Sequence, residues 1–144
     1  VNSILAKRHA TMKGFDEALF VDDEGFVCEA TGENVFAVFG DNIIAVSHHD
    51  ALPGITRDTI IALTGAKSER LHMVDLMNAD EIFITGTSAE IAPVTRLNAQ
   101  SFSVGPITKK LQATYQDVVH GRIPDWSHWL TNVNEFARPA RRTA

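Results

Sequence analysis

One hairpin signal near the middle of the chain constrains the fold more than any other feature. The apolar segments 35–39 and 43–46 flank Gly40, Asp41 and Asn42. Glycine and asparagine accept the backbone angles of a tight turn, and apolar runs on both sides of such a turn are typical of paired strands. A sheet built around this hairpin is therefore the expected centre of the fold.

Further strands are predicted on both sides of this hairpin. The apolar segments 17–21 and 26–30 flank an acidic turn that ends in glycine, which indicates a second hairpin. Residues 81–85 have the pattern of another strand, and a glycine turn then leads into a last apolar segment, residues 91–97.

Helical patterns separate these strands. They cover residues 1–13, 56–65, 74–79 and 107–120. Glycine follows the first, second and fourth of these segments or closes them, as is common at the ends of helices. Trp126 and Trp129 are expected to pack the end of the chain down. Because no repeat or linker interrupts the order, it predicts one domain, residues 1–144, of mixed α/β (α+β) class with a mixed sheet flanked by helices.

Composition narrows the class of protein. Apolar residues make up 44% of the 144 residues, which argues against a disordered chain. The net charge is −5, and no basic run is long enough to follow a phosphate backbone, so no nucleic-acid partner is expected. The basic segment 138–142 is interpreted as a solvated tail. No apolar run approaches the roughly 20 residues of a membrane helix, so no membrane partner is expected. Cys28 is the only cysteine, which favours a reducing cytoplasm.

The segment Leu52-Pro-Gly-Ile-Thr-Arg57 is the first candidate for chemistry. A Pro-Gly turn that leads into a helix leaves backbone N–H groups pointing outward, and with the Thr56 hydroxyl they would form a phosphate-binding site. On spacing alone, an ordinary capped helix is the more frequent explanation. The turn Thr85-Gly-Thr-Ser88 is rich in donors, but hydroxyl-rich turns are common.

Glu29 is the second candidate, because it lies within the apolar strand predicted at 26–30. Side chains alternate along a strand, so Glu29 shares one face with Val27. Its carboxylate either faces solvent, which is the more common case, or holds a cation. Cys28 is expected to be a small core residue. His48 and His49 are expected in a loop, and no metal site is predicted.

Four segments in this order resemble the class IV, or fold-type IV, aminotransferases. They are residues 29–36, 52–58, 79–94 and 105–112. The sequences Gly-Glu-Asn in the first segment and Gly-Thr-Ser-Ala-Glu in the third are similar to those of the branched-chain amino acid enzymes. The resemblance covers residues 1 to about 129. It implies the C-terminal large pseudo-barrel domain of that fold type, which binds pyridoxal 5'-phosphate.

The resemblance also implies roles for individual residues. Glu29 matches the carboxylate that bonds the pyridine nitrogen of pyridoxal phosphate, and Ile55, Thr56 and Thr87 match donors to its phosphate. Substrate-binding positions are implied at the two glycine turns: Gly32, Thr87, Ser88 and Ala89. Of these, Thr87 and Ser88 match the backbone N–H groups that receive the substrate carboxylate. Glu33 and Asn34 match motif residues with a structural role.

The chain departs from the family in two places. The lysine that bonds the cofactor and moves the proton is expected upstream of Val1, together with the small domain, so no catalytic residue is assigned in this chain. The lysines present are not expected to replace it: Lys7, Lys13, Lys67, Lys109 and Lys110. The connection 64–70 is shorter than usual, which places the helix end and one edge strand in question.

The expected function is transamination of branched-chain amino acids with 2-oxoglutarate by the parent enzyme, with this chain inactive alone. One alternative is a truncated, non-catalytic binding or dimerisation module. Another is a class IV relative that acts on D-amino acids or amines. A domain that lacks its small partner domain exposes an apolar face, so a homodimer is expected.

Overall fold

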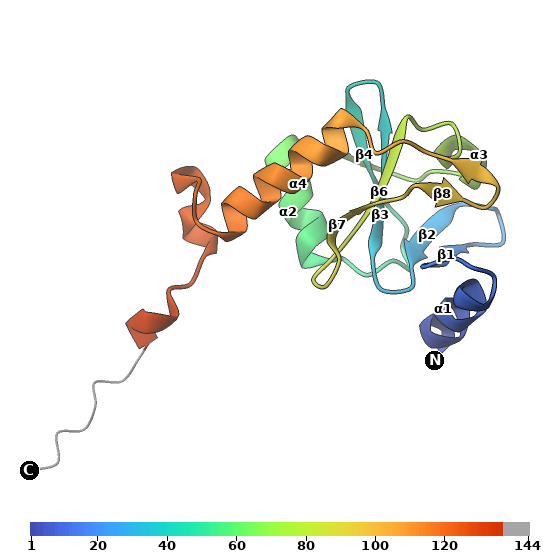
Figure 1. The fold of residues 1–144 in the computed structure, drawn as a ribbon, viewed down its shortest axis with the longest axis horizontal. Helices are drawn as coiled ribbons and strands as arrows, with labels where there is room; N and C mark the ends of the chain where they lie inside the picture. Colours follow the sequence, from blue (N-terminus) through green and yellow to red (C-terminus); the bar gives the residue numbers. More distant parts are fainter. Residues whose placement is uncertain (137–144) are drawn as a thin grey trace, which may run out of the picture. The chain divides into compact units, whose positions relative to one another are not determined.

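A five-stranded mixed sheet in the order β5-β4-β3-β6-β7 organises the computed structural model, which describes residues 1–136 (Figure 1). Its strands are β3 (Asn34–Phe39), β4 (Asn42–Val46), β5 (Lys67–Glu69), β6 (Glu81–Gly86) and β7 (Glu90–Pro93). β3 pairs antiparallel with both β4 and β6, whereas β5 pairs parallel with β4. The central hairpin is confirmed: Phe39 pairs with Asn42, and Gly40 turns the chain at φ +57°.

Two smaller sheets complete the strands. β1 (Leu19–Val21) pairs antiparallel with β2 (Val27–Ala30), which confirms the second predicted hairpin. The segment predicted as one strand over 91–97 is divided between β7 and β8 (Arg96–Leu97), and β8 pairs with β9 (Gln100–Ser101). Asn98, with a left-handed φ of +53°, lies in the turn between β8 and β9 and lets the chain fold back on itself there.

The four predicted helices are present. They are α1 (Asn2–Met12), α2 (Ile55–Thr64), α3 (Met73–Leu76) and α4 (Pro106–Val119). α2 ends at Gly65, whose φ of +69° lets its N–H bond the Ile61 carbonyl at 2.8 Å. β5 follows at once, so the short connection keeps both a defined helix end and an edge strand. No helix within residues 1–136 has the length and apolar character needed to cross a membrane.

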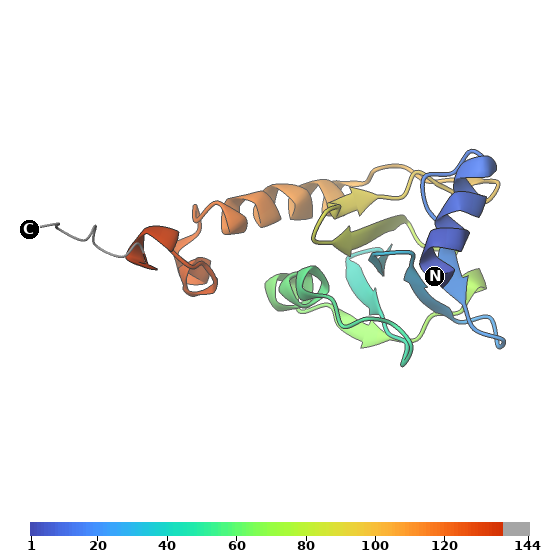
Figure 2. The ribbon, with the colours of Figure 1, turned by 90° about the horizontal axis from the view of Figure 1, so that it is seen from below.

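Alternating side chains of the sheet enter two layers of the core. Val35, Ala37 and Ile82 face the β1–β2 hairpin and α3, in a cluster that includes Val27. On the other face Phe36 stacks on Phe83 with ring centroids 4.8 Å apart. α2 packs against β4 and β6, and Figure 2 shows α2 on one side of the sheet and α1 with the β1–β2 hairpin on the other.

The chain divides into two compact units, residues 1–112 and a second that begins at Ala113. The second unit contains the short 3-10 helices η1 (Pro124–Trp129) and η2 (Val133–Phe136). Trp126 and Trp129 contact one another there, with ring centroids 4.2 Å apart. The basic segment 138–142 lies outside the described residues.

Candidate functional site

Glu29 contacts the segment that leads into α2. Its neighbours Val27, Cys28 and Ala30 are buried, whereas Glu29 itself is half-buried. Its Oε2 accepts a hydrogen bond from the Leu52 N–H at 2.8 Å. The structure thus answers the question left open by the strand pattern: the carboxylate binds backbone and remains partly accessible. Burial raises the pKa of the Cys28 thiol, and its place in the core is confirmed.

The N-terminus of α2 has no side-chain cap. Gly54 occupies the cap position in an extended conformation, and the first hydrogen bond inside the helix runs from the Asp58 N–H to the Gly54 carbonyl at 3.0 Å. The preceding N–H groups therefore have no acceptor within the helix. Thr56 is 5% exposed and Ile55 is 82% exposed. This end of the helix carries partial positive charge and suits an anion.

Asn34, the first residue of β3, holds the turn before α2 in place. Its side chain is buried, and its Nδ2 donates to the Leu52 carbonyl at 2.7 Å. A Cβ on Gly54 would collide with the Asn34 Oδ1, so this turn needs glycine in order to reach the strand. The sequence predicted a structural role for Asn34 but gave no signal that its partner is the candidate phosphate-binding segment.

The two glycine turns assigned to substrate lie against each other. A Cβ on Gly86 would come within 3.2 Å of both the Gly32 carbonyl oxygen and the Glu33 Cγ. Thr87 and Ser88 are exposed in the turn after β6, and Ala89 is half-buried. The space beside Gly32 is open. Gly32 is therefore near the 86–89 turn, whereas no hydrogen bond joins that turn to Thr56 within residues 1–136.

A charged cluster borders Gly32. Burial alone would raise the pKa of Glu17, but hydrogen bonds from the Lys7 ammonium, at 2.5 Å, and from the Thr31 hydroxyl lower that pKa to about 2. Burial, and then the charge of Glu17, raise the pKa of the neighbouring Glu33. These groups line a depression of about 530 Å³ against α1. The 31–33 turn is thus tied to α1 by charge.

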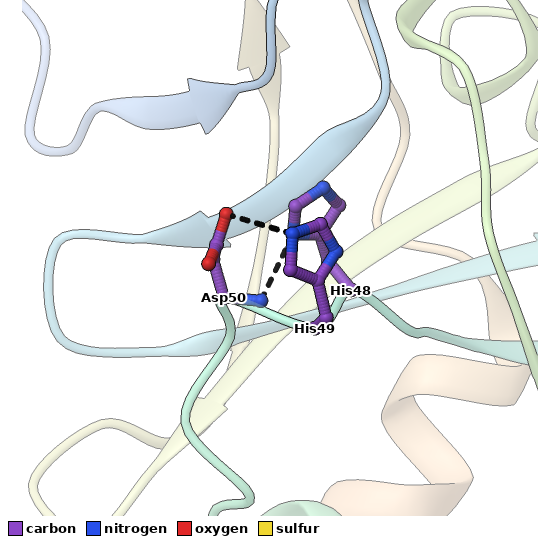
Figure 3. A group of neighbouring side chains, drawn as sticks. All are labelled: His48, His49 and Asp50. Atoms are coloured by element: carbon purple, nitrogen blue, oxygen red, sulfur yellow. Dashed lines mark hydrogen bonds and ion pairs between the residues drawn. The ribbon is translucent and has the colours of Figure 1, made fainter.

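His48 and His49 lie in the loop after β4, as predicted (Figure 3). The two rings stack at 4.3 Å, and their nitrogens approach an Asp50 oxygen closely enough for all three residues to hold a metal ion. Both nitrogens of the buried His48 ring are in use, however. Nε2 lies 3.0 Å from Asp22 Oδ2, and Nδ1 accepts the Asp50 N–H at 3.1 Å. The His48 hydrogen bond lowers the pKa of Asp22 to about 2. This arrangement is a brace between two loops, and the absence of a metal stays a prediction.

Comparison with known proteins bears on this geometry. The amino-transferase class IV family model matches residues 1–97. The probable branched-chain-amino-acid aminotransferase of Aquifex aeolicus is 38% identical over 143 residues, which cover 92% of this chain and 46% of that protein. The chain therefore spans about half the length of the curated relatives it matches.

Solved structures are similar as well. The branched-chain aminotransferase of Thermoproteus uzoniensis with norvaline is 37% identical with a TM-score of 0.85, over 90% of this chain and 46% of that one. The enzyme of Thermobaculum terrenum in its pyridoxal phosphate form is 38% identical with a TM-score of 0.84, over 90% and 46%. These similarities confirm the predicted fold class. The family match over residues 1–97 and the shared fold show that the chain belongs to the class IV aminotransferases.

Proposed function

We propose that this chain is the cofactor-binding domain of a pyridoxal phosphate-dependent aminotransferase that transfers amino groups between branched-chain amino acids and 2-oxoglutarate. One observation carries the proposal. The segment 52–56 bonds Glu29 through the Leu52 N–H and, a few residues later, begins an uncapped helix. A carboxylate and an anion-binding helix end are therefore held together by one short piece of backbone.

The chemistry of these groups fits pyridoxal phosphate. The second carboxylate oxygen of Glu29, Oε1, has no hydrogen bond within the part of the chain that the structure describes, so it can accept one from a protonated ring nitrogen. The N–H groups of Ile55 and Thr56 and the Thr56 hydroxyl can donate to a phosphate dianion. Thr87, in an exposed turn, would add a further donor.

Each group has a distinct task in the proposed reaction. The bound cofactor supplies a ring that accepts electrons from the substrate. Glu29 holds a proton on the ring nitrogen, and Thr56 anchors the phosphate end. The N–H groups of Thr87 and Ser88 orient the substrate carboxylate, with Ala89 beside its side chain and Gly32 allowing close approach. The lysine that moves the proton is expected upstream of Val1, so we propose that this chain is the C-terminal domain and does not turn over alone.

A titration tests the proposed cofactor role. Addition of pyridoxal phosphate to the 144-residue chain should give saturable absorbance changes, which Glu29→Gln weakens. Glu69→Gln, a change of an exposed carboxylate on edge strand β5, should leave the affinity unaltered. Equal binding by both variants and the unaltered chain would exclude Glu29 from the site.

Borohydride reduction with peptide mapping tests the absence of a reactive lysine. We expect no adduct, or a scatter of adducts over surface lysines such as Lys109 and Lys110. One stoichiometric adduct on a single internal lysine would show that the domain carries its own reactive group and would contradict the placement upstream.

We also propose that the chain forms a homodimer in the cytoplasm. Exposed apolar side chains on α1 support self-association: Ile4 is 74%, Leu5 59% and Met12 79% exposed. Such a surface is unusual for an isolated monomer. Cys28 as the only cysteine favours a reducing compartment. Light scattering that finds a monomer over a wide concentration range would contradict the dimer.

A further inference from the structure

We propose that Asn34 is a positioning residue that sets the phosphate-binding end of α2, an inference that rests on the proposed function. The backbone of Leu52 is held by hydrogen bonds at both its N–H and its carbonyl. Its N–H donates to Glu29 Oε2 at 2.8 Å, and its carbonyl accepts from Asn34 Nδ2 at 2.7 Å. One buried amide thereby fixes the segment before the helix, and the other hydrogen bond of Leu52 reaches the carboxylate assigned to the cofactor ring.

The segment 52–54 makes few other contacts that would fix its position. The Leu52 side chain is 70% exposed, and Pro53, also exposed, has no backbone N–H to donate. The orientation of this segment therefore depends on the two hydrogen bonds of the Leu52 backbone and on the contact between Gly54 and Asn34. Because Gly54 is the cap residue of α2, a shift at Asn34 moves the helix end directly.

Asn34 itself is placed rigidly. It is 6% exposed and lies opposite Thr85 in the β3–β6 pairing. Thr85 is followed by Gly86 and Thr87, the turn assigned to the second phosphate donor and to substrate. One strand residue thus relates the two segments that would donate to the phosphate. The buried Thr85 hydroxyl has no hydrogen-bond partner within the described residues.

This geometry predicts a selective defect when the amide is removed. Without its Nδ2 donor, the Leu52 carbonyl loses its partner and the helix end loses its fixed position. Pre-organised donors bind more tightly than donors that must be ordered during binding. The phosphate contribution to affinity should therefore fall more than the contribution of the ring.

The experiment compares pyridoxamine 5'-phosphate with pyridoxamine, ligands that cannot react with surface lysines. Asn34→Leu is nearly isosteric and adds no charge. We expect it to lower the preference for the phosphorylated ligand about tenfold, the effect of one well-placed hydrogen bond. Asn78→Leu is the matched control, because the Asn78 amide also donates to a carbonyl, that of Val74 at 2.8 Å, but on an exposed helix turn.

Gly54→Ala disturbs the same contact between Gly54 and Asn34, but from the Gly54 side. It is the variant to use if circular dichroism shows that Asn34→Leu does not fold. It should lower the same preference, because the new Cβ displaces the Asn34 amide. An unchanged preference, or an equal loss of affinity for both ligands, would overturn the positioning role and leave the proposed function standing. If the unaltered chain does not bind pyridoxamine phosphate, the proposed function fails, and this inference fails with it.

Discussion

Helices α2 and α4 begin in almost the same sequence, Gly-Ile-Thr at 54–56 and Gly-Pro-Ile-Thr at 105–108, yet their N-termini differ. At α4, the carboxylate of Glu81 accepts from the Ile107 N–H at 3.1 Å and from the Thr108 N–H at 2.7 Å. At α2, no side chain from the described part of the sequence caps the helix.

The comparison separates a structural helix end from one that is free to bind a ligand. Glu81 is 5% exposed and comes from a different element, β6, so its carboxylate fastens α4 to the sheet. The corresponding carboxylate near α2, Glu29, bonds Leu52 ahead of the helix, and within residues 1–136 the donors of the first turn have no side-chain partner. A helix N-terminus whose N–H donors are already hydrogen-bonded inside the protein has no free donors for a phosphate.

The largest effect should come from removing the carboxylate that caps α4. Glu81→Ala leaves two backbone N–H groups without their acceptor in a buried site, and we expect a loss of about 3 kcal/mol in the free energy of unfolding. Urea denaturation followed by circular dichroism measures it. Glu69→Ala, at an exposed position, is the control. A change at Glu81 of less than about 0.5 kcal/mol would remove the contrast between the two helices.

Glu29→Gln should have the opposite effect to Glu81→Ala: it should weaken cofactor binding and leave the stability of the fold almost unchanged. The amide keeps an oxygen that can accept from the Leu52 N–H, so unfolding changes little, whereas the charge that would face the ring nitrogen is lost. We expect affinity for pyridoxal phosphate to fall at least about tenfold. Parallel denaturation and absorbance titrations separate the two quantities. A large loss of stability with unaltered affinity would make Glu29 a structural carboxylate like Glu81.

Equivalent threonines at the two helix ends, Thr56 in α2 and Thr108 in α4, allow a second test of the comparison, with a smaller expected effect. Thr56→Val should weaken binding of pyridoxamine phosphate about fivefold, the value of one hydroxyl hydrogen bond. Thr108→Val is the equivalent change at α4, where the hydroxyl is buried without a partner among the described residues, so the variant should be as stable as the parent or more so. Titration of both variants checks the difference; equal affinities would show that the Thr56 hydroxyl does not reach the ligand.

The sequence predicted the elements around the site more completely than their long-range contacts. Gly40 and Gly65 mark a turn and a helix end because local backbone geometry requires them. Asn34 is different, since its amide reaches Leu52, 18 residues away, and a one-dimensional pattern does not show such a partner.

The burial of Glu81 could not be predicted from the sequence for a related reason. As the first residue of a strand it fits the pattern of a solvent-facing carboxylate, and its burial shows only in its contacts with Gly105 and the first turn of α4. The amphipathic pattern predicted for α1 gives a helix, but of its residues only Ala10 is buried, and the large apolar side chains are exposed. Periodicity predicts a helix face without identifying what covers it.

A pH-dependent effect is predicted for the hydrogen bond between His48 and Asp22, which holds the loop leading to Leu52. The pKa of Asp22 is about 2 in the folded chain against 3.8 without its partners, foremost the His48 hydrogen bond. A lowered pKa stabilises the fold above the unfolded value, and that contribution disappears as pH falls through the folded value. Asp22→Asn should therefore be less stable than the parent above about pH 4, and the two should converge toward pH 2. Denaturation midpoints measured across this window test it, because every other carboxylate titrates in both chains. A difference that does not depend on pH would show that Asp22 acts through its shape and not through its charge.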